Sequence, residues 1–341
     1  MKCIALNSLT EFRNAEQLTD YDIIFASPEF VYDHLSKFVS EPLRRQIALV
    51  AFDEAHCLTE WGTDSFRPKY GHLADLLSII PEAAVLVTTG TMTSAMREST
   101  MKSLHIEQYK TVAYSPDRPE IFIDSMSPDL ENLSWLCDEL ITHGSQCSKT
   151  IIYCRTIKDI NDLFVMFLDQ LNENIYANGD PTSVNNRHIE MFSAALSEKH
   201  KSRILERFTK DSNLRVVIAT IAFGMGIDIP DIRNIVLWGA PESVCHFWQQ
   251  IGRCGRDGKS SKAIYYRKSV PSLMKSSKEL KAIFQHDSTQ CIRKKLLEYL
   301  WLPEMGALSS PQAECLSRCK DCRCFMCKCC AVCQKGCACN T

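Results

Sequence analysis

The chain has 341 residues, which is enough for about two domains at the usual ~150 residues each. Hydrophobic residues make up 45% and charged residues 23%, as in ordinary globular proteins, so a disordered or collagen-like chain is excluded. The longest apolar runs, such as residues 47–52, are far shorter than the ~20 residues that span a bilayer, and no secretory signal pattern opens the sequence. We therefore expect a folded intracellular protein with no membrane partner.

The charge is distributed unevenly along the chain. The net charge is -2, but residues 271–341 hold 11 Lys and Arg against 6 Asp and Glu, which makes +5 there and -7 in the first 270 residues. A basic C-terminal end favours contact with a polyanion, while a solvated charged face is the simpler alternative.

Short apolar runs rich in β-branched residues alternate with stretches of helical period, which is the βαβ rhythm of an α/β fold. The first part predicts three strands of one parallel sheet, and the second part predicts a new α/β unit. The strands expected first are residues 21–26, 47–52 and 84–89, and those expected later are 150–153, 215–219, 234–238 and 262–266. The helices expected are one opening at Pro28, then 130–141, 158–171, 199–209 and 243–251.

Two acidic residues stand where α/β sheets bind ligands. Asp53 and Glu54 come directly after the buried run 47–52, and Ala55 and His56 complete the sequence DEAH. In a nucleoside triphosphatase, the first acid of such a pair helps to hold Mg²⁺ and the second orients the attacking water. A solvated pair of loop acids is the simpler alternative.

Two glycine-containing segments lie further along. Residues 220–228 follow a predicted strand, and their glycines permit a close backbone approach to a ligand. Residues 249–258 end a predicted helix and carry Arg253 and Arg256 three positions apart, where both guanidinium groups could meet a phosphate. Taken alone, either segment could equally be structural.

Cysteine is the most unusual feature of the composition. Ten of the 18 cysteines lie in the last 27 positions. In a chain without a secretory signal, this density favours thiolate ligation of zinc over disulfides.

Taken together and in order, these segments resemble the RecQ family of superfamily 2 DNA helicases over almost the whole chain. The resemblance is carried by residues 27–29, 53–56, 57–70, 88–93, 151–154, 219–228 and 249–258, and by the run 291–297. It implies two RecA-like parallel-sheet lobes, the first of them incomplete, followed by a small helical Cys-rich zinc-binding module. The implied boundaries are 1–115, 116–270 and 271–341.

The resemblance also implies roles for individual residues. ATP would bind between the lobes, with Asp53, Glu54 and His56 acting from lobe one and Arg253 and Arg256 reaching the γ-phosphate from lobe two. The residues expected to contact the nucleotide and couple it to lobe movement are Gly226, Asp228 and Gln249.

The loop after DEAH is expected to contact DNA. In the family this loop is rich in aromatic residues and couples DNA to ATP, and here it holds Trp61, Phe66, Arg67 and Tyr70. Aromatic rings beside a cation suit stacking on unpaired bases. Packing of Trp61 and Phe66 in the core is the alternative.

No P-loop of the pattern G-x-x-x-x-G-K-[ST] occurs in these 341 residues. The only Gly-Lys-Ser begins at Gly258 and has Arg253 where the first glycine is required. Family members place the P-loop well upstream of DEAH. We therefore expect either a fragment of a longer helicase or a truncated protein without independent catalysis.

The family pattern of one cysteine on a helix and three after a loop implies a tetrahedral zinc site. The chosen ligands are Cys291, Cys315, Cys319 and Cys322, and Cys324 or Cys327 could replace one of them. The remaining cysteines exceed the needs of one zinc ion, which leaves room for a second site or for unliganded thiols.

The expected function is that of a RecQ-like ATP-dependent 3′ to 5′ DNA helicase in recombination and repair, acting on single-stranded and forked duplex DNA with ATP, Mg²⁺ and Zn²⁺. One alternative is a catalytically inactive nucleic-acid-binding remnant. Another is a thiolate metal-storage protein, which explains only the tail. Family habit places such an enzyme in the nucleus.

Overall fold

The computed structural model describes residues 1–7, 15–38, 40–61, 68–126, 133–221, 223, 228–266, 276–284, 290–308 and 325–337. The chain divides into two compact units, which are described separately. Unit 1 comprises Met1–Pro116 and Leu300–Gly306, and unit 2 comprises Asp117–Tyr299 and Ala307–Thr341. The expected three-part division of the chain remains a prediction. None of the described helices is both long and apolar enough to cross a membrane.

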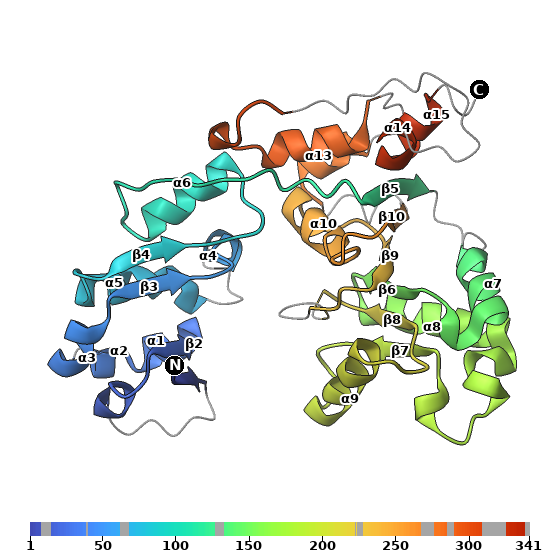
Figure 1. The fold of residues 1–341 in the computed structure, drawn as a ribbon, viewed down its shortest axis with the longest axis horizontal. Coiled ribbons are helices and arrows are strands. Elements are labelled where there is room, and N and C mark those ends of the chain that lie inside the picture. The colour runs from blue at the N-terminus through green and yellow to red at the C-terminus, as the bar shows by residue number, and fades with distance from the viewer. Residues whose placement is uncertain are drawn as a thin grey trace. The chain divides into compact units, whose positions relative to one another are not determined.

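Unit 1 contains two pairs of parallel strands with short helices between them (Figure 1). Its strands are β1 (Cys3–Leu6), β2 (Ile23–Ala26), β3 (Leu49–Phe52) and β4 (Ala84–Val87). Its helices are α1 (Pro28–Asp33), α2 (Leu35–Phe38), α3 (Glu41–Gln46), α4 (His56–Trp61), α5 (Leu73–Ile79) and α6 (Ser94–Ser103), with 3₁₀ turns η1 (Ala15–Leu18), η2 (Pro68–His72) and η8 (Pro303–Met305).

The prediction of one sheet through the first three expected strands is wrong for the described residues. Strand β2 pairs with β1, which the sequence analysis had missed, and β3 pairs with β4. One hydrophobic cluster gathers under β1 and β2 around Leu6 and Phe30, and another under β3 around Phe52 and Leu58. The first cluster also includes Leu76 of α5 and has Val50 of β3 packed against it, so the two strand pairs share core contacts although their backbones do not pair.

Unit 2 is built on a six-stranded sheet whose strands are all parallel, in the order β5-β10-β9-β6-β8-β7. The strands are β5 (Ile121–Met126), β6 (Lys149–Cys154), β7 (Ile189–Phe192), β8 (Val216–Ala219), β9 (Ile232–Trp238) and β10 (Ser261–Tyr266). This sheet confirms the predicted second α/β unit, although β5 and β7 were not expected.

Helices cover both faces of this sheet, as its continuous apolar strands require. Figure 1 shows α7 (Ser134–His143) and α8 (Ile157–Leu171) on one side and α9 (Glu198–Thr209) and α10 (Val244–Ile251) on the other. The remaining helices are α12 (Lys278–Ile283), α13 (Ile292–Leu300), α14 (Phe325–Cys329) and α15 (Ala331–Lys335), and the 3₁₀ turns are η4 (Gly144–Gln146), η5 (Asn172–Ile175), η6 (Ala177–Gly179) and η7 (Val184–Asn186).

The core of unit 2 follows from the apolar stripe of α8. Leu163 and Phe167 lie one turn apart on this helix, are fully buried, and pack against the sheet residues Ile152, Ile218 and Val236. Thr156 caps the helix by accepting a hydrogen bond from the backbone N–H of Asp159. The sheet is therefore a rigid support for the loops at its carboxyl edge.

Candidate functional site

The acids of the DEAH sequence lie at the carboxyl end of β3 in unit 1. Glu54 has φ 49°, in the left-handed region that non-glycine residues seldom adopt. This turn lets the Glu54 N–H donate to Asp53 Oδ1 over 2.9 Å. Thr88, directly after β4, donates its hydroxyl to the same oxygen over 2.9 Å. Asp53 is thus oriented by its own strand end and by the neighbouring one.

His56 connects the second acid to the segment that follows β4. It opens α4 and is 5% exposed. Its Nδ1 lies 3.0 Å from Thr89 Oγ1 and 3.3 Å from Glu54 Oε2. The structure therefore brings the three predicted residues of this site together in one cluster.

Thr88 and Thr89 are members of this cluster that the sequence analysis did not single out as site residues. The signal that could have identified them is topological. Residues that follow neighbouring parallel strands meet at one edge of the sheet, and both DEAH and the threonines follow such strands.

Two of the four predicted DNA-contacting residues lie outside the part of the chain that the structure describes. Phe66 and Arg67 fall in the undescribed segment 62–67, and only the backbone of Trp61, at the end of α4, is described. Tyr70, in η2, is partly buried and packs against the cluster around Phe52. A role for these four residues in DNA binding remains a prediction.

The two predicted arginines lie in unit 2, on the loop that follows α10. We call residues 252–258 the arginine loop. Arg256 Nη1 forms an ion pair with Asp228 Oδ1 over 2.7 Å, so the structure brings together two residues that the sequence analysis had assigned to the same site. Gln249 is on α10, and Gly226 lies outside the described residues.

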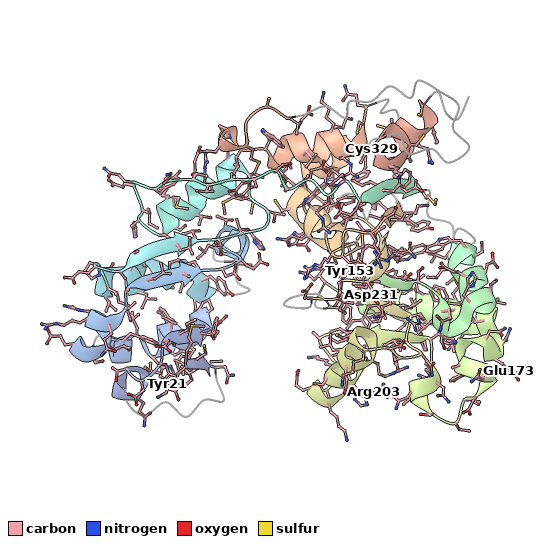
Figure 2. All side chains as sticks on the ribbon, in the orientation of Figure 1. Tyr21, Tyr153, Glu173, Arg203, Asp231 and Cys329 are labelled. Atoms are coloured by element: carbon pink, nitrogen blue, oxygen red, sulfur yellow. The ribbon has the colours of Figure 1, made fainter. Side chains whose placement is uncertain are left out.

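Tyr153 lies near the carboxyl end of β6, a strand that is buried throughout (Figure 2). Burial raises the pKa of its hydroxyl to about 12, and the positive charges of Arg253 and Arg256 partly oppose that shift. Tyr153 remains neutral at physiological pH, so it does not cancel the positive charge of the loop.

The path of the arginine loop depends on a glycine. Gly255 has φ 63°, and a Cβ there would lie 2.8 Å from Ser261 Oγ and 3.0 Å from the Lys259 carbonyl oxygen. The neighbouring Cys254 is fully buried, and burial raises the pKa of its thiol to about 12. The loop is thus a packed part of unit 2.

Four cysteine sulfurs converge in unit 2. They belong to Cys291, just before α13, to Cys329 at the end of α14, to Cys330 between α14 and α15, and to Cys333 on α15, and all lie within 4.8 Å of one another. We call these four residues the cysteine cluster. Cys291 Sγ is 3.5 Å from Cys329 Sγ and 3.9 Å from Cys330 Sγ. Four thiolates around one zinc at ~2.3 Å would stand about 3.8 Å apart, so the cluster fits a tetrahedral site.

The sulfurs of the cysteine cluster are joined by hydrogen bonds. Hydrogen bonding with Cys291 contributes most to lowering the pKa of Cys330, followed by Cys329 and Cys333. The N–H of Lys294 lies 3.4 Å from Cys291 Sγ, as for a donor to a thiolate. The cluster therefore favours at least one thiolate, which is the form that binds zinc.

The structure tests the predicted set of zinc ligands only in part. Cys291 is in the cluster, but Cys315, Cys319 and Cys322 lie outside the described residues, in segment 309–324. The three partners that the structure supplies come from the later part of the tail. The sequence offered no spacing that distinguished them among so many cysteines.

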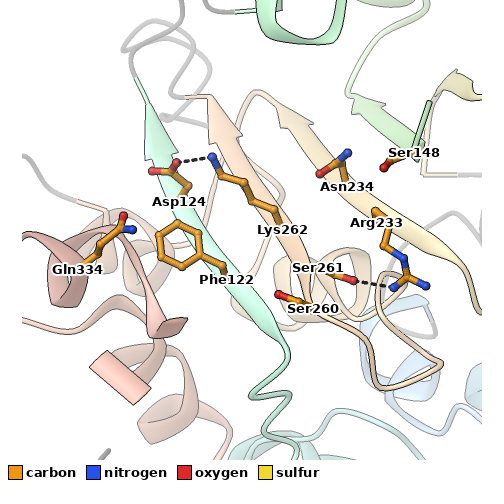
Figure 3. A pocket seen from close by; sticks show the side chains of 9 residues that line it. All are labelled: Phe122, Asp124, Ser148, Arg233, Asn234, Ser260, Ser261, Lys262 and Gln334. Atoms are coloured by element: carbon orange, nitrogen blue, oxygen red, sulfur yellow. Dashed lines mark hydrogen bonds and ion pairs between the residues drawn. The ribbon is translucent and has the colours of Figure 1, made fainter. Parts of the chain in front are cut away.

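Figure 3 shows a polar pocket near the amino-terminal ends of β5, β9 and β10. An ion pair of 3.0 Å joins Lys262 to Asp124 there, and Arg233 donates to Ser261 Oγ over 3.1 Å. Arg233 also pairs with Asp257 of the arginine loop. The pocket contains none of the predicted site residues, and Arg233 holds the far end of the loop from this side.

Two family models match the chain. Residues 2–99 match the DEAD/DEAH box helicase model, and residues 131–258 match the helicase conserved C-terminal domain. The chain is 28% identical over 270 residues to the ATP-dependent DNA helicase RecQ of Pasteurella multocida, covering 76% of this chain and 39% of that protein. It is 30% identical over 276 residues to the probable ATP-dependent DNA helicase RecS of Bacillus subtilis, covering 78% and 51%.

A putative ATP-dependent RNA helicase of Acanthamoeba polyphaga mimivirus is 30% identical over 241 residues, covering 71% of this chain and 40% of that protein. The chain thus spans about half the length of these relatives or less. It belongs to the DEAD/DEAH box helicases, and its relatives include RecQ-family DNA helicases, which confirms the resemblance seen in the sequence.

Solved structures show the same fold. A structure of Mss116p bound to ssRNA and AMP-PNP aligns with a TM-score of 0.61 at 18% identity, covering 89% of this chain and 61% of that one. The helicase MrfA bound to DNA and AMPPNP aligns with a TM-score of 0.59 at 16% identity, covering 80% and 38%. At these identities the likeness supports the RecA-like α/β fold alone.

Proposed function

We propose that this chain is the motor part of a RecQ-like helicase that couples ATP hydrolysis to 3′ to 5′ movement on DNA, in recombination and repair. The observation that carries the proposal is the hydrogen-bonded cluster at the DEAH acids, together with the RecQ relatives. The nuclear location expected from the resemblance belongs to the same proposal.

The DEAH cluster suits a magnesium-bound nucleotide. Among the described residues, both hydrogen bonds that Asp53 accepts fall on Oδ1, which leaves Oδ2 for a hard cation. In this proposal Mg²⁺ neutralises phosphate charge, and Asp53 helps to hold it. Glu54 orients the attacking water, and His56 keeps the Glu54 carboxylate in place through the 3.3 Å contact.

The arginine loop would supply the positive charge that the transition state needs. Arg253 and Arg256 carry permanent charges in a planar donor array that matches phosphate oxygens. Asp228 holds Arg256 through an ion pair on the loop's exposed side. In this proposal, exchange of that carboxylate for a phosphate accompanies nucleotide binding.

DNA is proposed as the substrate because the relatives RecQ and RecS are named as DNA helicases, while the viral relative is named as an RNA helicase. Trp61, Phe66, Arg67 and Tyr70 would stack on unpaired bases of single-stranded and forked DNA. Lys and Arg contacts to phosphate would make the binding strongly salt-dependent.

Zinc is proposed as a structural ion in the cysteine cluster. Cys291, Cys329, Cys330 and Cys333 would hold it, and the ion would contribute the folding energy typical of four-thiolate sites. The role is architectural, because four protein ligands leave no open position for a substrate.

The experiment compares DNA binding and ATP hydrolysis in two proteins: the 341-residue chain, and the same chain joined to an upstream segment that carries a P-loop of the pattern G-x-x-x-x-G-K-[ST]. We expect both to bind 3′-overhang and forked DNA and only the joined protein to hydrolyse ATP and unwind. Glu54→Gln in the joined protein should abolish turnover without weakening DNA binding.

The outcomes separate the alternatives. A joined protein that binds DNA without turnover would support the inactive nucleic-acid-binding remnant. Preference for RNA over DNA of the same sequence would overturn the substrate assignment. Failure of both folded proteins to bind any nucleic acid would overturn the helicase proposal.

A further inference from the structure

Arg118, just before β5, contacts the backbone of the arginine loop. Its Nη1 donates to the Gly252 carbonyl over 3.0 Å, and its Nη2 donates to the Cys254 carbonyl over 3.1 Å. These carbonyls flank Arg253 in the sequence. One planar guanidinium therefore holds the backbone on both sides of a predicted phosphate-binding arginine.

Glu120 completes this contact. The Arg118 Nε donates to Glu120 Oε1, and a Cβ on Gly255 would lie 3.2 Å from Glu120 Cγ. The Glu120 carbonyl accepts from the Ser261 N–H over 2.9 Å, which ties this segment to the start of β10. Glu120 and the start of β10 therefore pack against the loop at Gly255, and Arg118 binds the loop carbonyls on both sides of Arg253.

A second arginine joins the Arg118 segment to the cysteine cluster. Arg293, two residues after Cys291, is 2% exposed. Its Nη1 donates to Asp117 Oδ1 over 2.7 Å and to the Arg118 carbonyl over 2.8 Å. Its Nη2 donates to the Cys329 carbonyl over 3.2 Å and to the Ile121 carbonyl.

Asp117 closes the connection between the two arginines. Its Oδ1 also accepts from the Arg118 N–H over 2.8 Å, so one carboxylate oxygen bonds both Arg293 and the Arg118 backbone. A continuous series of charge-assisted hydrogen bonds thus runs from the Cys329 backbone through Arg293 and Arg118 to the loop. Buried and partly buried bonds of this kind resist rearrangement because each freed group would be poorly solvated.

We propose that Arg118 is a positioning residue for the arginine loop, and that Arg293 makes the order of the loop depend on the order of the cysteine cluster. The inference rests on the proposed function in one respect only: the roles of Arg253 and Arg256 toward ATP are taken from it. The physical coupling itself concerns the folded chain and can be tested without turnover.

The test is amide hydrogen exchange resolved to the arginine loop. The Gly255 N–H donates to the Ile232 carbonyl over 3.0 Å and the Gly258 N–H to the Gly255 carbonyl over 2.9 Å, so both amides report loop order. Arg118→Lys keeps the charge but loses the planar fork. We expect it to speed exchange of these amides about tenfold while α8 keeps its protection.

Arg207→Lys is the matched control. Arg207 also donates to one carboxylate, Glu190, and to two backbone carbonyls, those of Asn185 and Arg187, but none of these belongs to the arginine loop. We expect faster exchange near residues 185–190 and no change in the loop. Unchanged loop exchange in Arg118→Lys, or equal loop effects in both variants, would overturn the positioning role.

A second arm tests the connection to the cysteine cluster. Zinc-loaded protein and protein stripped by a chelator are compared, as wild type and as Arg293→Lys. We expect stripping to speed loop exchange severalfold in the wild type. In Arg293→Lys the loop should already exchange faster, and stripping should add less than about twofold.

The result that contradicts the coupling is loop exchange that does not respond to stripping in the wild type. If Arg293→Lys loses protection throughout α8, the wild-type comparison decides the matter alone. The proposed function fails separately, when Arg253→Ala leaves ATP hydrolysis by the P-loop-joined protein unchanged.

Discussion

The hydroxyl of Thr88 donates to Asp53 Oδ1 over 2.9 Å, across the carboxyl ends of two neighbouring parallel strands. The same oxygen accepts the N–H of Glu54. The strand end that carries the acids therefore does not set the Asp53 carboxylate by itself. A substitution at Thr88 should therefore displace the Asp53 carboxylate although Asp53 itself is retained.

Thr88→Val should lower the free energy of unfolding by about 1 kcal/mol, because it removes a hydrogen bond at nearly constant volume. In the P-loop-joined protein it should also lower kcat for ATP about tenfold through a misplaced Asp53. Thr88→Ser, which keeps the hydroxyl, is the control. Chemical denaturation and steady-state ATPase assays provide the measurements, and equal kcat in both variants would contradict the role.

The 341-residue chain should show negligible DNA-stimulated ATPase activity. Losing a single arginine finger costs ~10³-fold or more in such enzymes, and lacking a P-loop cradle should cost at least as much. A coupled assay with single-stranded DNA provides the measurement. Clear turnover by this chain that disappears in Glu54→Gln would show that another segment replaces the P-loop.

Purified protein should hold at least one zinc ion. Cys330→Ser should lower the zinc content and loosen α14 and α15, because metal binding energy is folding energy in such a site. Cys3→Ser, which changes an exposed cysteine of unit 1, is the matched control. Elemental analysis of reduced protein measures the result, and absence of zinc from the unaltered chain would refute the site.

The same measurement decides between ligand sets. If the sequence-based set is right, replacing Cys315, Cys319 and Cys322 together by Ser should remove the zinc. If the cysteine cluster is right, that triple variant should keep one zinc ion that Cys291→Ser then removes.

Gly255→Ala should destabilise unit 2 by about 1–3 kcal/mol, because it combines a left-handed backbone with a Cβ 2.8 Å from Ser261 Oγ. Gly258→Ala is the control. Its φ is also positive, at 75°, but a Cβ there meets no atom within 4 Å. Thermal unfolding of both variants measures the difference, and equal destabilisation would show that the close contacts contribute nothing.

Stability should fall as the pH rises above about 9, partly through Cys254. Its thiol has a folded pKa of about 12 against an ordinary value of 9.0, because burial disfavours the thiolate. Between these values the folded state binds more protons than the unfolded state, so each pH unit costs about 1.4 kcal/mol for this group. Cys254→Ser should reduce the slope between pH 9 and 11 by that amount in denaturant titrations. An unchanged slope would contradict the burial argument.

Local patterns in the sequence were sufficient for four of the six strands of the second α/β unit and for the position of the DEAH acids at a strand end. The alternation of short apolar runs with helical-period segments reports burial directly, because strands covered on both faces must be apolar throughout. Asp53 and Glu54 could be placed at a sheet edge because they follow such a run. Their family roles came from the order of several motifs along the chain.

Only the tertiary structure decided which residues meet across long sequence separations. Thr88 reaches Asp53 because β3 and β4 pair, and Cys329 reaches Cys291 because α14 packs beside the start of α13. No local pattern distinguishes these partners from the other threonines and cysteines. The contacts of Arg118 and Arg293 with backbone carbonyls could not be predicted from the sequence for the same reason. Every residue carries a backbone carbonyl, so the sequence does not mark which ones accept these hydrogen bonds.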